Sequence, residues 1–170
     1  MWSLSTWGKM HPLFIWFNWL IILTTYARIA PMPTQFNLHP RLATDTLPVA
    51  ELPLCRALLM NDSRWPWLIL VPRVAELREV HHLETSQRAT LMEEMALAAK
   101  ALDAVCQPQK INLGALGNLV PQLHVHVIGR HGADPAWPGP VWGFGEAEPY
   151  ADGQGEDLVL KLAPHLAGLG

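Results

Sequence analysis

Residues 121–130 read PQLHVHVIGR, and the side chains along this stretch alternate in character. Successive side chains of a β-strand point to opposite faces of the sheet. A strand over residues 122–128 would therefore have an apolar face made of Leu123, Val125 and Val127. Its polar face would be made of Gln122, His124 and His126. A buried polar group without a partner costs about 1–3 kcal/mol, so we expect the polar face to meet solvent, a metal or a ligand.

The spacing of His124 and His126 leaves three readings of this polar face open. Side chains two residues apart on one face are about 6.5–7 Å apart, which suits an incidental exposed face, a metal pair or a phosphate site. A metal would need further ligands, and no carboxylate or third histidine stands at a suitable spacing. We favour phosphoryl chemistry, because neutral imidazole is a good nucleophile at pH 7 and can attack phosphorus.

The chain before this stretch predicts a hairpin and one long helix. Two apolar runs, residues 55–60 and 67–71, flank a turn cluster and read as a β-hairpin. Residues 86–106 have apolar side chains at steps of three and four, typical of a helix with Thr85 as its N-cap. The proline-punctuated residues 36–53 predict loops and short turns.

A further strand is expected from residue 111, followed by a bend at Gly114, Gly117 and Asn118. A short helix is expected at residues 158–166. The order of strand, strand, helix, strand, strand favours an α+β fold. We expect an antiparallel sheet of about five strands with one main helix and a short C-terminal helix. Trp137 and Trp142 come after the histidine strand. We expect them to form a lid or a dimer contact, or else to anchor the loop in which they lie.

Composition limits the partners and the metal chemistry. The chain has 170 residues, half of them hydrophobic and 16% charged, which suits one globular domain. The net charge of −3 gives no general basic surface for nucleic acid. Cys55 and Cys106 form neither a disulfide framework nor a zinc knuckle. The pair His81 and His82 is expected to be solvated loop, so we predict no metal site.

The N-terminal residues 1–31 differ from the rest, with no Asp or Glu and four of the eight tryptophans. They could be a signal peptide, a short membrane anchor, or an extension upstream of a true start at Met32. We favour the start at Met32 and a cytoplasmic protein, with anchoring or export as the alternative. The expected parts are an apolar extension at 1–31, a domain at 32–145 and an acidic tail at 146–170.

Three segments together resemble a known family. They are the hairpin CRALLMND…WPWLILVPR, the single helix after it, and KINLGALGNLVPQLHVHVIGR. The last segment resembles the signature of the histidine-triad (HIT) family, in which three histidines alternate with apolar residues before a Gly-Arg or Pro-Arg pair. The likeness spans residues 36–142. It is closer to the bacterial diadenosine-polyphosphate-hydrolase-like branch than to the galactose-1-phosphate uridylyltransferases, whose core motif is His-Pro-His.

This resemblance assigns roles to individual residues. The middle motif histidine falls on His124, which in the family attacks the α-phosphate of a nucleotide and holds a nucleotidyl-histidine intermediate. The third falls on His126, which supports the nucleophile and the phosphate. Substrate-binding residues implied by the turn and the resemblance are Asn61 or Asp62 for the ribose and Asn112, Gly117 and Asn118 for the phosphates. Leu54, Leu58 and Leu70 are candidates for a base pocket or for plain core.

The sequence departs from the family pattern at two positions. Gln122 stands where the first motif histidine is expected, and Trp67 stands where members often carry an upstream histidine. Glutamine can still hydrogen-bond but cannot titrate near pH 7. A proton relay contributes roughly 10²–10⁴-fold to a rate, and an amine leaving group needs it more than a phosphate does. We therefore expect phosphoanhydrides to be preferred over phosphoramidates.

The resemblance also implies the activity and the partners. We expect a nucleotide hydrolase or transferase that cleaves a nucleoside 5′-phosphoanhydride of the dinucleoside polyphosphate type, with His124, His126 and Gln122 in its catalytic centre. The alternative is a nucleotide-binding module with weak or no catalysis. A homodimer is expected, with no obligatory cofactor beyond a divalent cation that the nucleotide can bring.

Overall fold

The computed structural model describes residues 35–167. The predicted extension at 1–31 and the predicted start at Met32 lie outside them. The elements, in order, are α2 (Pro40–Asp45), β1 (Thr46–Glu51), β2 (Cys55–Met60), β3 (Trp67–Pro72), the 3-10 turn η1 (Val80–His82), α3 (Thr85–Cys106), β4 (Lys110–Gly114), β5 (Val125–Arg130) and α4 (Gln154–Leu166). The strands form one sheet in the order β1-β2-β3-β5-β4, and all neighbours are antiparallel. The predicted α+β fold is confirmed.

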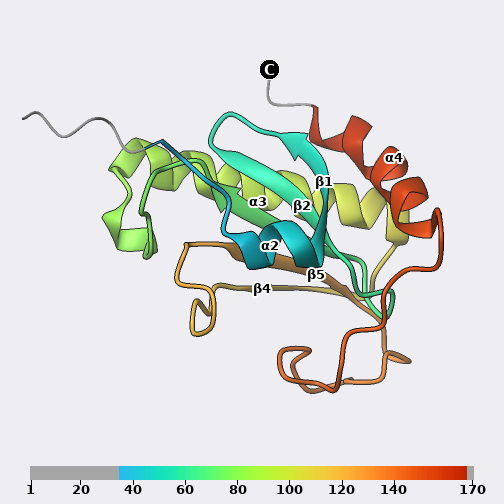
Figure 1. Cartoon of the computed structure of the whole chain (residues 1–170). Coiled ribbons are helices and arrows are strands. Elements are labelled where there is room, and N and C mark those ends of the chain that lie inside the picture. The colour runs from blue at the N-terminus through green and yellow to red at the C-terminus, as the bar shows by residue number, and fades with distance from the viewer. Residues whose placement is uncertain (1–34, 168–170) are drawn as a thin grey trace, which may run out of the picture. The chain divides into compact units, whose positions relative to one another are not determined.

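Both faces of the sheet are covered (Figure 1). On one face α3 and α4 pack against the strands, and the cluster there includes Leu70, Val127, Leu102 and Leu162. On the other face lies a second cluster, which includes Ile69 and Ile128 from the strands, Leu42 from α2 and Val141 from the segment after β5. Side chains of β5 alternate between these clusters, so His126 lies on the α2 face while Val125 and Val127 face α3.

The histidine strand begins three residues later than predicted. Pairing between β3 and β5 ends at Leu70 and Val125, so residues 122–124 precede the strand. The backbone N–H of Leu123 instead donates to the carbonyl of Leu77 at 2.8 Å. Gln122 therefore lies outside the strand, and the alternation of side chains along β5 does not determine which way its side chain points.

The prediction of loops over residues 36–53 is wrong, because α2 and β1 lie in this segment. Each of these two elements contains a proline at a position where it is tolerated. Pro40 is the first residue of α2, where a helix needs no N–H donor. His39 caps this helix, its Nδ1 accepting from the N–H of Arg41 at 3.2 Å. Pro48 lies in β1, at the edge of the sheet, and the pairing with β2 shifts register just after it.

The helix boundaries also differ from those predicted. The N-cap of α3 is Glu84, not Thr85, and its backbone N–H donates to the side chain of Gln87 at 3.0 Å. The C-terminal helix begins at Gln154, four residues earlier than expected, and places Leu162 and Leu166 in the core. Between residues 35 and 167, no helix combines the length and apolar character needed to cross a membrane.

Candidate functional site

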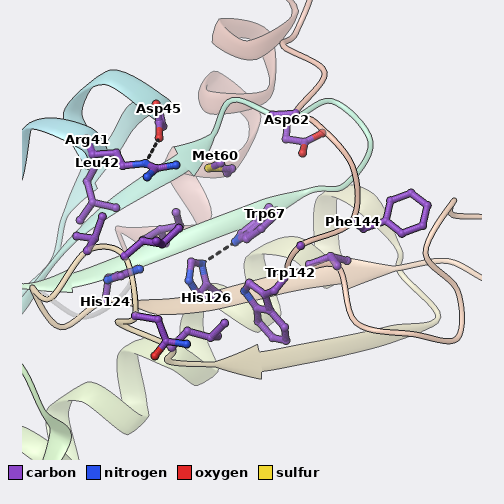
Figure 2. A pocket seen from close by; sticks show the side chains of 18 of the residues that line it. Arg41, Leu42, Asp45, Met60, Asp62, Trp67, His124, His126, Trp142 and Phe144 are labelled. Carbon is purple, nitrogen blue, oxygen red and sulfur yellow. Dashed lines mark hydrogen bonds and ion pairs between the residues drawn. The ribbon is translucent and has the colours of Figure 1, made fainter.

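A cavity of about 410 Å³ lies on the α2 face of the sheet, beside the start of β5 (Figure 2). Side chains from four parts of the chain line it. They include Met60, Trp67, Ile69 and His126 from the strands, Arg41, Leu42 and Asp45 from α2, residues 116–120, and residues 141–145. His124, just ahead of β5, lines the same cavity. Part of the lining is therefore apolar, and the two imidazoles form another part of it.

His124 is held by the backbone two residues before it. Its Nδ1 lies 2.7 Å from the carbonyl oxygen of Gln122. A carbonyl oxygen only accepts, so Nδ1 of the neutral ring carries the proton and Nε2 keeps its lone pair. The side chain is 7% exposed. This is the tautomer that an imidazole nucleophile requires.

His126 is held in the opposite tautomer. The indole Nε1–H of Trp67 donates to Nδ1 of His126 at 2.9 Å, and an indole nitrogen only donates. Nε2 of His126 therefore carries the proton. Burial and the neighbouring His124 lower the pKa of His126 to about 3, so this ring is neutral at pH 7. The ring centroids of His124 and His126 are 4.8 Å apart, which brings a lone pair and an N–H donor to one cavity.

Trp142 closes the other side of His126. Their ring centroids are 5.8 Å apart, and Trp67 packs on His126 at 5.3 Å. The indole of Trp142 also covers Gly114 of β4, where a Cβ atom would come within 2.7 Å of the ring. A glycine is needed at this position for Trp142 to lie against the site. Trp142 lines the cavity and also packs against the second core cluster.

The turn between β4 and β5 supplies the backbone of the cavity. Gly117 and Asn118 line it together with His124. Gly117 has a φ of +70°, in the left-handed region that favours glycine. The structure thus brings these two predicted phosphate residues to the two histidines.

Of the two residues predicted near the ribose, only Asp62 lines the cavity. It is 2% exposed, and its carboxylate forms a two-pronged ion pair with Arg64, with distances of 2.8 Å to Nε and 2.6 Å to Nη2. The side-chain oxygen of Asn61 instead accepts from the backbone N–H of Tyr150 at 3.0 Å. Asn61 therefore fastens the C-terminal segment, and Asp62 with Arg64 shapes the cavity.

Asn112 does not line the cavity. Its side-chain oxygen accepts from Nη1 of Arg130 at 2.8 Å. Arg130 is buried and forms a second two-pronged pair with Asp134, at 2.7 and 2.9 Å. Hydrogen bonds from Arg130 hold the pKa of Asp134 well below its usual range. This network fastens the segment after β5, and the residue types gave no signal for it beyond the Gly-Arg pair.

Gln122 does not line the cavity either. Its side-chain oxygen accepts from the backbone N–H of His39 at 2.9 Å, and its amide donates to the carbonyl of Asn37 at 2.9 Å. These contacts hold the segment that leads into α2, the helix that supplies Arg41 and Leu42 to the cavity wall. Gln122 is thus placed to position that wall.

The leucines considered for a base pocket are core residues. Leu54 and Leu70 lie in the cluster under α3, and Leu58 lies in the other cluster without lining the cavity. The apolar wall is formed instead by Leu42, Met60, Ile69 and Val141. Leu42 was missed because its segment was expected to be loop. Within residues 35–167, no group of histidine, cysteine and acidic side chains is arranged to hold a metal.

Fold and site together define a small α+β protein with a histidine-centred cavity on one face of an antiparallel sheet. The HIT domain family model matches residues 42–133, and the chain belongs to this family. Among functionally curated proteins no match is found.

Three crystal structures of bacterial histidine triad proteins are similar over nearly their whole length. The protein from Sinorhizobium meliloti 1021 is 48% identical, over 76% of this chain and 96% of its own, with a TM-score of 0.75. The protein from Marinobacter aquaeolei VT8 is 46% identical, over 80% and 99%, with a TM-score of 0.77. The protein from Bradyrhizobium japonicum is 39% identical, over 78% and 98%, with a TM-score of 0.75.

Proposed function

We propose that this protein is a nucleotidyl hydrolase or transferase that cleaves a nucleoside 5′-phosphoanhydride of the dinucleoside polyphosphate type. The observation that carries the proposal is the pair of opposite tautomers at one cavity. His124 offers the lone pair of Nε2, and His126 offers the proton on its Nε2. A nucleophile and a neutral hydrogen-bond donor side by side suit attack on a phosphate whose oxygens carry negative charge.

The proposed reaction has two steps. Nε2 of His124 attacks the α-phosphorus, a P–N bond forms, and the bond to the bridging oxygen breaks, so that the remaining phosphates leave as an anion. Water then attacks the same phosphorus, the P–N bond breaks with its electrons returning to Nε2, and the water proton passes to solvent. The Nε2–H of His126 donates to a phosphate oxygen in both steps, and the apolar wall with Leu42 and Ile69 receives the base.

The state of the two groups behind the nucleophile favours a phosphate leaving group. The pKa of His126 is lowered to about 3, so this imidazole is no acid at neutral pH. The amide of Gln122 is engaged with Asn37 and His39. An amine needs a proton to leave, whereas a polyphosphate does not. Diadenosine tetraphosphate should therefore turn over faster than an adenosine phosphoramidate, and the reverse order would refute this preference.

A single-turnover reaction with α-labelled diadenosine tetraphosphate tests the covalent step. Wild-type protein should acquire label that is labile in acid and stable in base, as expected of a P–N bond. His124→Ala should acquire none while still binding nucleotide. If the wild-type protein binds nucleotide but acquires no label, the result would instead indicate a nucleotide-binding module.

We also propose that the protein forms homodimers and needs no organic cofactor. Three exposed leucines support the first point: Leu113 in β4, and Leu116 and Leu119 in the turn after it, are 49%, 43% and 77% exposed. Apolar side chains gathered in one segment favour a contact surface. Light scattering should give twice the chain mass, and Leu119→Lys should lower the measured mass.

Dialysis against a chelator before addition of magnesium-free substrate tests whether a divalent cation is required.

A further inference from the structure

A second cavity, of about 250 Å³, adjoins the first at His124. The two share His124 and the turn residues Leu116, Gly117 and Asn118. The remainder of the second cavity includes Arg78 and Glu79, from the segment between β3 and α3. Its lining is mainly polar, unlike the apolar wall of the first cavity.

The segment that carries Arg78 is fastened directly to the chain beside His124. The carbonyl of Leu77 accepts from the N–H of Leu123 at 2.8 Å, so Arg78 and His124 each follow one member of a hydrogen-bonded pair. Leu77 is buried, and the backbone turns into it through Glu76, which has a left-handed φ of 55°. A non-glycine residue in this region is held there by its surroundings, so the backbone at Arg78 has a defined place beside the segment that carries His124.

Charge distinguishes Arg78 from the other arginines at the two cavities. Arg41 pairs with Asp45 at 3.3 Å, and Arg64 pairs with Asp62 at 2.6 Å. Arg78, in contrast, forms no ion pair with any carboxylate of residues 35–167. A guanidinium group without a counter-ion, in a polar cavity beside a phosphate-directed histidine, is suited to bind phosphate oxygens through its fork of N–H donors.

We propose that the second cavity binds the phosphates beyond the scissile bond, with Arg78 as their main ligand. This inference rests on the proposed function, in which the α-phosphorus lies at His124. A substrate centred there extends in two directions. The nucleoside occupies the larger, apolar cavity, and the departing phosphate chain occupies the smaller, polar one.

Binding of inorganic tripolyphosphate to the full chain, measured by calorimetry, tests the subsite without any catalysis. Arg78→Ala should weaken this binding about ten- to hundredfold, the usual loss for hydrogen bonds to a charged group. Binding of adenosine 5′-monophosphate should change less than twofold. Equal tripolyphosphate binding by wild type and Arg78→Ala would overturn the proposal, as would an equal loss of both ligands.

Glu79→Gln is the matched control, because it removes the opposite charge from the same cavity. It should bind tripolyphosphate as tightly as wild type or more tightly. A loss as large as that of Arg78→Ala would show that the cavity's shape, not the arginine's charge, is being disturbed, and would count against the subsite. Repeating the titrations in His124→Ala separates this result from the proposed function, since that variant cannot form the covalent intermediate.

Measurement of turnover with two substrates gives a second, independent test of the subsite. Arg78→Ala should lower kcat/KM for diadenosine tetraphosphate by at least tenfold. It should leave the p-nitrophenyl ester of adenosine 5′-monophosphate nearly unaffected, because this leaving group has no phosphates. Equal losses for both substrates would contradict the assignment.

Discussion

Nε1 of Trp67 lies 2.9 Å from Nδ1 of His126, and this hydrogen bond decides which nitrogen of His126 is protonated. An imidazole partner could donate or accept, whereas an indole can only donate. By the family resemblance, Trp67 stands at a position where members often carry a histidine. The tryptophan therefore fixes the tautomer of the neutral His126, with the proton on Nε2.

Trp67→Phe tests this role, because it keeps an aromatic ring and removes the N–H. We expect a mixture of His126 tautomers, a rise in the pKa of His126 and a loss of about fivefold in kcat/KM, the equivalent of one hydrogen bond of about 1 kcal/mol. Ring ¹⁵N shifts report the tautomer directly. Trp142→Phe is the matched control, since the indole nitrogen of Trp142 has no hydrogen-bond partner among the described residues. Unchanged ring shifts in Trp67→Phe would contradict the role.

The lowered pKa of His126 predicts a pH-dependent loss of stability. The folded state binds this proton only near pH 3, whereas the unfolded chain binds it near 6.5. Between these values the unfolded state holds more protons, so stability is lost as the pH falls, by at most about 1.4 kcal/mol per pH unit. Urea unfolding at several pH values should show a shallower slope for His126→Gln in this window. Parallel curves for the two proteins would contradict the shift.

Gln122 should affect nucleotide binding more than chemistry. Gln122→Glu replaces the amide that donates to Asn37 with an oxygen that repels its carbonyl. The segment leading into α2 should loosen, and with it the wall that carries Leu42. We expect KM to rise about five- to tenfold while the single-turnover rate at saturation stays within about twofold. A fall in that rate with unchanged KM would instead place Gln122 in the chemistry.

Gly114 should be coupled to Trp142. A methyl group at residue 114 would meet the Trp142 ring at 2.7 Å, so Gly114→Ala should destabilise the protein by about 1–3 kcal/mol. Trp142→Leu removes the obstructing ring. The double variant should therefore be more stable than the sum of the two single effects predicts, as measured by denaturant unfolding. Additive effects would show that the two positions are independent.

Two ion pairs with the same sequence spacing should differ in their contribution to stability. Arg130–Asp134 is buried, with side chains 2% and 4% exposed, whereas those of Arg41–Asp45 are 57% and 40% exposed. Asp134→Asn should cost about 3–5 kcal/mol, because Arg130 stays buried without its charge partner. Asp45→Asn should cost at most about 1 kcal/mol. Similar losses for both would contradict this difference.

The Asp134 contribution also has a predicted pH dependence. The pKa of Asp134 is lowered in the folded state, so its stabilisation is present above the ordinary pKa of about 4 and is lost as the pH falls below it. The stability difference between wild type and Asp134→Asn should shrink in acid. A constant difference from pH 6 to pH 2 would show that the charge is not responsible.

Local patterns were sufficient to predict β2, β3 and α3, because each has an apolar periodicity of its own and a clear boundary. They were not sufficient for β1. Pro48 is tolerated there only because β1 lies at the edge of the sheet, and edge position depends on the pairing of all five strands. The predicted start of β5 was wrong for a similar reason, because the pairing between β3 and β5 ends at Leu70 and Val125.

At the site, residue types predicted His124 and His126 but not their partners. The contact between Trp67 and His126 joins residues 59 positions apart, and it follows from strand pairing rather than from either segment alone. Gln122 was assigned to the histidine face by alternation, a rule that holds only within a strand. Arg78 gave no signal because its segment has no periodicity and its position depends on the Leu77–Leu123 contact.

The two edges of the sheet are unequal, and this limits how copies of the chain can aggregate. A strand added at β1 would meet Pro48, which has no N–H to offer, and a shift in register. A strand added at β4 would meet regular backbone. Two copies joined through β4 would each have used their open edge, leaving β1 at both ends of a continuous sheet. In such an assembly both exposed edges would be β1, where Pro48 offers no N–H to a further strand.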